Sequence, residues 1–162
     1  MRYSGLYLAR HNAVVERIKT TASNKFEILY ENQVCGNSGL RPDLVIKRSQ
    51  NIFIIDVTIP FDNRLAAFDS AARERVERYH NLCSELATTD GVEATVVPFV
   101  VGALGGWFTK NDEFLHQLCS PKYATMMRKL CISEVIGFSR DFYIQHLTNI
   151  PQRTPTIRPT AT

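Results

Sequence analysis

The chain has 162 residues and a mass of 18.4 kDa, and 44% of its residues are hydrophobic and 22% charged. This length and composition are those of one ordinary globular domain with its own core. Nineteen basic against sixteen acidic residues give a formal net charge of +3, which is too small an excess for a histone-like protein or a basic nucleic-acid-binding tail. Acidic residues concentrate in the middle third of the chain and basic residues in both flanks, so any basic surface is local.

Hydrophobic periodicity predicts a helix, three strands, a helix, a strand and two final helices, in that order. The first helix carries its apolar face on Tyr7, His11, Val14 and Ile18. The β-branched strand over 93–101 is expected to be buried on both faces. The predicted ranges are 4–20 for the first helix, 26–30, 40–46 and 52–59 for the three strands, 65–86 for the next helix, 93–101 for the last strand, and 107–118 and 121 onward for the closing helices.

These elements predict an α/β fold with a mixed central sheet flanked by helices, in one domain over residues 1–149. From position 150 on, prolines and threonines dominate the sequence. The tail over 150–162 is therefore expected to be disordered.

The cysteines are spread along the chain, at Cys35, Cys83, Cys119 and Cys131. Their spacing excludes a zinc knuckle and a thioredoxin-like motif, and a disulfide framework is not expected at this size. Buried, reduced thiols in an intracellular compartment are expected instead.

The N-terminal residues lack the apolar run of a signal sequence, and no stretch approaches the ~20 apolar residues of a membrane span, so no membrane partner is expected.

Two aspartates interrupt the apolar strands of the central hairpin. If the hairpin turns at Ser49 and Gln50, Asp43 lies directly opposite Asp56. At a β-carbon separation of about 4.5–5.5 Å two carboxylates repel each other, so such a pair does not serve stability. A divalent cation such as Mg²⁺, which binds carboxylate oxygens, removes the conflict. Alternatively, Asp43 ends its strand and Asp56 caps a loop in another register.

Pro42-Asp43, twelve intervening residues and then Asp56 after the apolar run IFII resemble the signature of PD-(D/E)XK nucleases, whose αβββαβ core has the same order of elements. Five segments, RHNAVVERI, RPDLVI, IIDVTIPFDN, ERVERYHNL and PFVVGALGGW, resemble more closely the restriction-like endonuclease domain at the C-terminal end of R-two-class non-LTR retrotransposon polyproteins. The resemblance extends to about Asn149. It implies a restriction-endonuclease-like αβββαβ core, with a mixed central sheet flanked by helices and extra C-terminal helices.

The resemblance also implies a function. Members of this group are Mg²⁺- or Mn²⁺-dependent endodeoxyribonucleases that nick double-stranded target DNA in the nucleus, so that the reverse transcriptase domain of the parent polyprotein primes on the exposed end. Asp43 and Asp56 match the metal-binding carboxylates of the family and are the first candidate catalytic residues. Glu16 on the first helix resembles the acid that some nucleases of this fold contribute as a further ligand; the alternative is a solvated surface charge.

The lysine of the nuclease signature is absent, because Thr58 stands two residues after the second acid. Retrotransposon members carry the lysine on the following helix, in a segment that reads EKxxKYxxL, and this chain has Arg75 and Arg78 at the two lysine positions. Arginine stays protonated above about pH 12, so Arg75 could stabilise charge on the phosphate but could hardly accept a proton. Tyr79 shares a helix face with Arg75 and is a further candidate catalytic residue, or else a core residue.

Four basic residues are candidate DNA phosphate contacts or, alternatively, ordinary solvated charges: Lys47 and Arg48 at the hairpin tip, and Arg73 and Arg78 on the helix. His11 is expected to be a satisfied core residue. Three functions stay open: a Mg²⁺-dependent endonuclease, a catalytically decayed module that binds DNA or stabilises a larger polyprotein, and a dimeric relative of Holliday-junction resolvases. The intact aspartates favour the first, whereas the arginines and the missing CCHC zinc knuckle favour the second.

Overall fold

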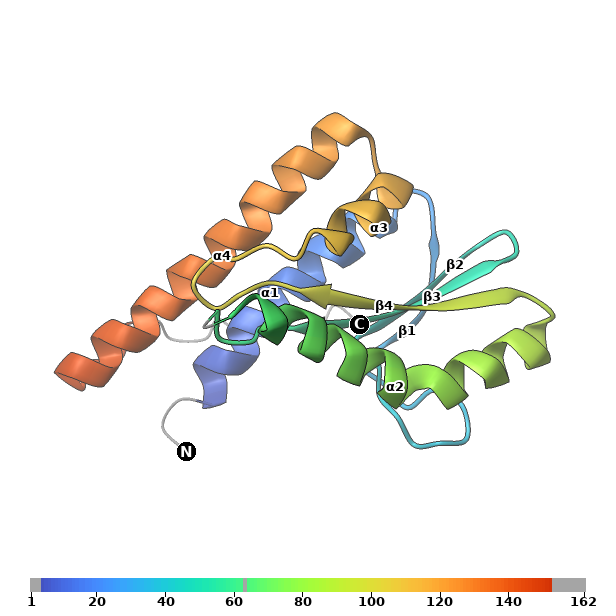
Figure 1. The fold of residues 1–162 in the computed structure, drawn as a ribbon, viewed down its shortest axis with the longest axis horizontal. Helices are drawn as coiled ribbons and strands as arrows, with labels where there is room; N and C mark the ends of the chain where they lie inside the picture. The colour runs from blue at the N-terminus through green and yellow to red at the C-terminus, as the bar shows by residue number, and fades with distance from the viewer. Residues whose placement is uncertain (1–3, 63, 153–162) are drawn as a thin grey trace, which may run out of the picture.

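The computed structural model describes residues 4–62 and 64–152, and in this part of the chain the elements follow the predicted order (Figure 1). A four-stranded mixed sheet carries helices on both faces, which confirms the predicted α/β class. None of the helices described is long and apolar enough to cross a membrane. The elements are α1 (Ser4–Ala22), β1 (Glu27–Glu31), β2 (Leu44–Arg48), β3 (Asn51–Thr58), α2 (Leu65–Asp90), β4 (Glu93–Val100), α3 (Lys110–Leu118) and α4 (Pro121–Thr148).

The strands lie across the sheet in the order β1, β2, β3, β4. The first three pair antiparallel, whereas β4 runs parallel to β3. A parallel neighbour needs a long crossover connection, and the 26-residue helix α2 provides it. The carboxyl ends of β3 and β4 therefore lie at the same end of the sheet.

Alternation along the strands divides the core into two layers. Leu44, Ile55 and Phe99 point to the face that α1, α3 and α4 cover. Val45 and Ile54 point to the opposite face, which α2 covers. Figure 1 shows α2 apart from the other three helices, on its own side of the strands. The central strands are thus apolar on both sides, as buried strands are.

The buried face of α1 matches the predicted one only in part, at Val14 and Ile18. Tyr7 is 55% exposed, and the buried line runs through Leu6, Arg10, Val14 and Ile18. Because α1 packs both on the sheet and along α4, its covered side is wider than the single predicted stripe and includes Leu6 and Arg10.

Several element boundaries also differ from those expected, and α2 ends at Asp90 rather than at position 86. β2 begins at Leu44 rather than at position 40. α3 begins at Lys110 rather than at position 107, because Trp107 pairs with Val101 in an isolated bridge that closes the preceding turn. The expected disordered tail lies outside the described residues from position 153 onward.

β4 is not buried on both faces, contrary to the expectation for residues 93–101. Its first four residues are exposed or half-buried, and only its second half enters the core. Ala94 and Val96 are half-buried in the α2 layer, whereas Glu93 and Thr95, on the opposite face, are exposed. β4 also lies at the edge of the sheet, with β3 on one side only. An open strand edge is a site for unwanted pairing with another chain.

Backbone hydrogen bonds show which groups of β4 face that open edge. Glu93 N–H donates to the Gln50 carbonyl, and Val101 N–H donates to the Thr58 carbonyl. The odd positions of β4 therefore turn their backbone groups to β3, and the even positions turn theirs outward. Pro98 is one of the even positions, and proline has no N–H to offer there.

Side chains cover the remaining outward groups of β4 at two points. Asn111, which is 1% exposed, accepts from Val100 N–H at 3.1 Å and donates to the Val100 carbonyl at 2.7 Å. Cys83 Sγ lies 3.0 Å from the Ala94 carbonyl oxygen. Cys83 is one of four free cysteines, of which two are buried and two half-buried rather than all four buried. Side chains therefore cover the open edge of β4 at Ala94 and at Val100.

Asn111→Ala should destabilise the domain by about 2–4 kcal/mol, because it leaves both backbone groups of the buried Val100 without a partner and each such group costs about 1–3 kcal/mol. Urea unfolding followed by circular dichroism measures the change. Asn81→Ala, on the exposed side of α2, is the matched control and should shift the free energy of unfolding by less than about 0.5 kcal/mol. Equal effects at the two positions would contradict the role of Asn111 at the edge.

Candidate functional site

Two aspartates lie side by side where β2 begins and β3 ends. The hairpin has the register that the sequence predicts, and Leu44 opposite Ile55 is its last pair. Asp56 lies within β3, and Asp43 directly precedes β2. The predicted register is therefore confirmed, with Asp43 just beyond the strand rather than inside it.

Pro42 explains why the ladder stops at this point. Continuing the register past Leu44 and Ile55 would pair Pro42 with Val57, and proline lacks the N–H that this hydrogen-bonded pair needs. Asp43 Oδ2 instead accepts a hydrogen bond from Val57 N–H at 2.7 Å. The side chain of Asp43 thus takes the place of a backbone acceptor and is held against β3.

Asp56 is buried between β3 and α2, with 7% of its side chain exposed. Tyr79 donates a hydrogen bond of 2.9 Å to Asp56 Oδ1, and Arg75 Nη1 lies 3.2 Å from Asp56 Oδ2. Tyr79 Oη is also 3.3 Å from the Arg41 carbonyl oxygen, which connects α2 to the segment before β2. The spacing of four residues places Arg75 and Tyr79 on the same face of α2, as predicted, and that face meets the carboxylate.

The charges of the two aspartates oppose each other. Burial raises the pKa of Asp56 above its ordinary value, and the charge of Asp43 raises this pKa further. Arg75 and the hydroxyl of Tyr79 lower it without cancelling the rise. Burial, together with the charge of Asp56, also raises the pKa of Tyr79, which therefore stays a neutral donor. The pair carries a repulsion that a bound cation would relieve.

His11 of α1 belongs to this site, and its assignment to the core was wrong. His11 Nε2 lies 2.9 Å from Asp43 Oδ2, and 28% of the His11 side chain is exposed. The hydrogen bond to Asp43 raises the pKa of His11 and outweighs the opposing effect of burial. The one sequence signal was a polar ring on the predicted apolar face of the first helix, between Tyr7 and Val14.

Glu16 lies apart from the aspartates. Its side chain is exposed on α1. At about 100° per residue it lies about 140° around the helix from His11, which faces Asp43. The structure therefore does not bring the predicted third acid to the pair.

The predicted phosphate contacts lie in different places. Arg78 lies over the ring of Tyr79, at 5.6 Å from its centroid, and so borders the site. Lys47 and Arg48 lie at the far end of β2. Their distance from Asp43 is four and five residues, or about 13–17 Å along a strand.

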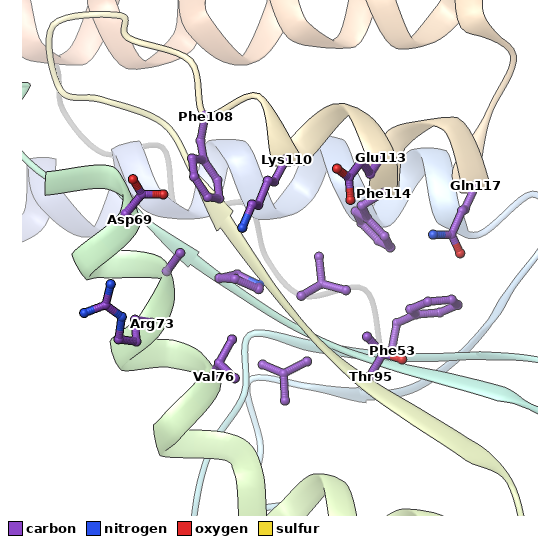
Figure 2. Close-up of a pocket in the computed structure, with 14 residues that line it drawn as sticks. Phe53, Asp69, Arg73, Val76, Thr95, Phe108, Lys110, Glu113, Phe114 and Gln117 are labelled. Carbon is purple, nitrogen blue, oxygen red and sulfur yellow. The ribbon is translucent and has the colours of Figure 1, made fainter. Parts of the chain in front are cut away.

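Arg73 borders a separate groove between α2, β4 and α3 (Figure 2). The groove has a volume of about 530 Å³ and an apolar floor that includes Phe53. Figure 2 shows the side chain of Lys110 extending from α3 toward that floor. Neither Asp43 nor Asp56 lines this groove. Arg73 therefore serves a different surface from the one that holds the aspartates.

Within residues 4–62 and 64–152, no group of three or more His, Cys, Asp or Glu side chains could hold a metal ion. Mg²⁺, however, often binds one or two carboxylates and completes its coordination with waters and phosphate oxygens. Each carboxylate oxygen has two lone-pair sites, so the oxygens of Asp56 keep acceptor capacity beside Tyr79 and Arg75. The hydrogen bonds that His11 Nε2 and Val57 N–H form with Asp43 are both to Oδ2 and not to Oδ1. The donor set therefore fits a hard cation such as Mg²⁺ or Mn²⁺.

No protein-family model matches the chain, and no curated protein matches it. The resemblance to PD-(D/E)XK nucleases therefore remains a prediction from the segments quoted above. The paired aspartates, with the side chains that α1 and α2 direct to them, are the observations from which a function is argued.

Asp56→Asn should raise the free energy of unfolding at pH 7 when divalent cations are removed with EDTA. Because the folded pKa of Asp56 lies above its ordinary value of 3.8, the stability linked to its proton is present at low pH and is lost as the pH rises through the folded pKa. The variant has no charge to desolvate, so its advantage over the wild type should grow from about pH 3 to pH 7. Urea unfolding across this range measures the difference.

This outcome is diagnostic because most substitutions of buried residues destabilise, by about 0.5–3 kcal/mol. An Asp56→Asn variant that is less stable than the wild type at pH 7 would show that the carboxylate stabilises the fold. Asp56 would then be a structural residue.

Proposed function

We propose that this chain is a metal-dependent DNA endonuclease that nicks duplex DNA, with Asp43 and Asp56 as its metal-binding residues. The observation that carries the proposal is the pair itself: two carboxylates at one end of a hairpin, one of them buried, with charges that repel. Such an arrangement costs stability, which a function at the pair explains. The order of helices and strands supports a restriction-endonuclease-like core.

Each side chain of the site has a role in this proposal. Asp43 and Asp56 hold a Mg²⁺ or Mn²⁺ ion, which when bound polarises the scissile phosphate and lowers the pKa of a water molecule. Tyr79 keeps Asp56 in place through a neutral hydrogen bond. Arg75 has 28% of its side chain exposed beside Asp56, where its charge can stabilise the phosphate of a bound strand.

Double-stranded DNA is the partner that this chemistry requires. In the proposal Arg78 contacts the backbone next to the site, and Lys47 and Arg48 contact phosphates further along the duplex. The nick serves target-primed reverse transcription in the nucleus, by the reverse transcriptase domain of a non-LTR retrotransposon polyprotein.

A second candidate function is a DNA-binding module that has lost catalysis. It is favoured by the contact of Arg75 with Asp56, because this contact places a basic group on a carboxylate that would bind the metal. Arginine in place of lysine also removes a side chain that can exchange a proton. The two functions share DNA binding and differ in phosphodiester cleavage, so a nicking assay separates them.

The purified chain should convert supercoiled plasmid to the nicked form in Mg²⁺ or Mn²⁺ and not in EDTA. Asp43→Asn or Asp56→Asn should slow nicking by at least about 10²-fold, because metal catalysis supplies several kcal/mol and each 1.36 kcal/mol is tenfold in rate. DNA affinity should stay equal or rise slightly, since a negative charge facing phosphate has been removed. Gel electrophoresis measures nicking, and filter binding measures affinity.

Asp90→Asn, at the exposed end of α2, is the matched control and should nick at the wild-type rate. Equal nicking by the wild type and by Asp56→Asn would indicate a contaminating nuclease and contradict the proposed site. A wild-type protein that binds DNA and does not nick it would support the second candidate function.

Arg75→Lys should raise the nicking rate. A lysine ammonium is a compact charge that can approach the attacking water, whereas a guanidinium spreads its charge and needs more room. Positioned acid-base assistance is typically worth about 10²–10⁴-fold, so even a partial gain is visible in a single-turnover assay. If Arg75→Lys is no faster and Arg75→Ala is equally fast, the positive charge of the site comes from elsewhere, and Arg78 is the next candidate.

A further inference from the structure

α1 reaches the aspartate pair through one side chain. His11 lies 32 positions before Asp43 in the sequence, and its Nε2 is 2.9 Å from Asp43 Oδ2. The helix that carries it is anchored on α4, where Arg17 forms an ion pair of 2.5 Å with Glu134. His11 is therefore presented to the site by a helix that is packed in place.

Two donors converge on one oxygen of Asp43. Val57 N–H donates to Oδ2 at 2.7 Å, and His11 Nε2 lies on the same oxygen. One donor belongs to the sheet and the other to a helix, so together they restrict the carboxylate to one orientation. Val57 directly follows Asp56, which means that Asp43 is held against the strand that carries its partner. Oδ1 is the oxygen left facing away from both donors.

The ring of His11 is also held at its second nitrogen. His11 Nδ1 lies 3.2 Å from Asn12 Oδ1. Both ring nitrogens are thus engaged with side-chain oxygens, and neither is directed to a metal ion. His11 therefore orients Asp43 and does not itself bind the ion.

The geometry points to His11 as a positioning residue for Asp43: it holds Oδ2, so that Oδ1 faces the cation bound between Asp43 and Asp56. This inference rests on the proposed function, since it requires an ion at the pair. Loss of a hydrogen-bond partner that supports a metal ligand typically costs about 10–100-fold in metal affinity or activity. The contribution of α1 to the site is therefore His11 and not Glu16.

Mn²⁺ binding to the DNA-free protein, measured by electron paramagnetic resonance of the free ion, tests this inference without relying on activity. His11→Ala should weaken Mn²⁺ binding by about 10–100-fold and raise the Mn²⁺ concentration for half-maximal nicking by the same factor, with an unchanged KM for DNA. His11→Gln, whose amide N–H can reach the same oxygen, should recover most of the affinity. His116→Ala, an exposed histidine on α3, is the matched control.

Hydrogen exchange of the Val57 amide is a readout that needs no metal. Exchange should be faster in His11→Ala, because the Asp43 carboxylate then keeps one donor instead of two. Unchanged Mn²⁺ affinity in His11→Ala would overturn this inference and leave the proposed function intact. A wild-type protein that neither binds Mn²⁺ nor nicks DNA would overturn both.

Discussion

A carboxylate buried in a β-sheet is the constraint on which the rest of this structure depends. Asp56 lies in β3 between Ile55 and Val57, where an apolar side chain would stabilise the core, and burial raises its pKa instead. A buried charge needs hydrogen-bond donors, and α2 supplies two, from Arg75 and Tyr79. α2, the crossover helix that the parallel strand β4 requires, therefore also supplies the side chains that stabilise the buried carboxylate of Asp56.

The two layers of the core meet at the aspartate pair. α2 covers one face of the sheet and reaches Asp56, whereas α1 packs on the other face and reaches Asp43 through His11. α1 in turn depends on α4, through the ion pair of Arg17 with Glu134. The geometry of the aspartate pair thus depends on α4 as well, because α4 fixes the position of α1, which holds Asp43.

Local rules suffice to predict the order of the elements and the core of the site. A two-residue turn at Ser49 and Gln50 gives the hairpin one register, but the sequence leaves another register open because both faces of the central strands are apolar. The register of that turn brings Asp43 to Asp56. The helical repeat likewise places Arg75 on the same face as Tyr79. These features follow from short-range geometry, which the sequence specifies directly.

The sequence by itself therefore determined the face of α2 that carries Arg75 and Tyr79 and, for a turn at Ser49 and Gln50, the pairing of the two aspartates, and the structure confirms that turn. Only the tertiary structure decided which residues of α1 join the site. Periodicity predicts that a helix has a buried face, but it does not say which neighbours cover that face. Because α1 lies between the sheet and α4, Tyr7 is exposed, His11 meets Asp43 and Glu16 faces solvent. Contacts between distant segments depend on how whole elements pack, and no local pattern encodes that.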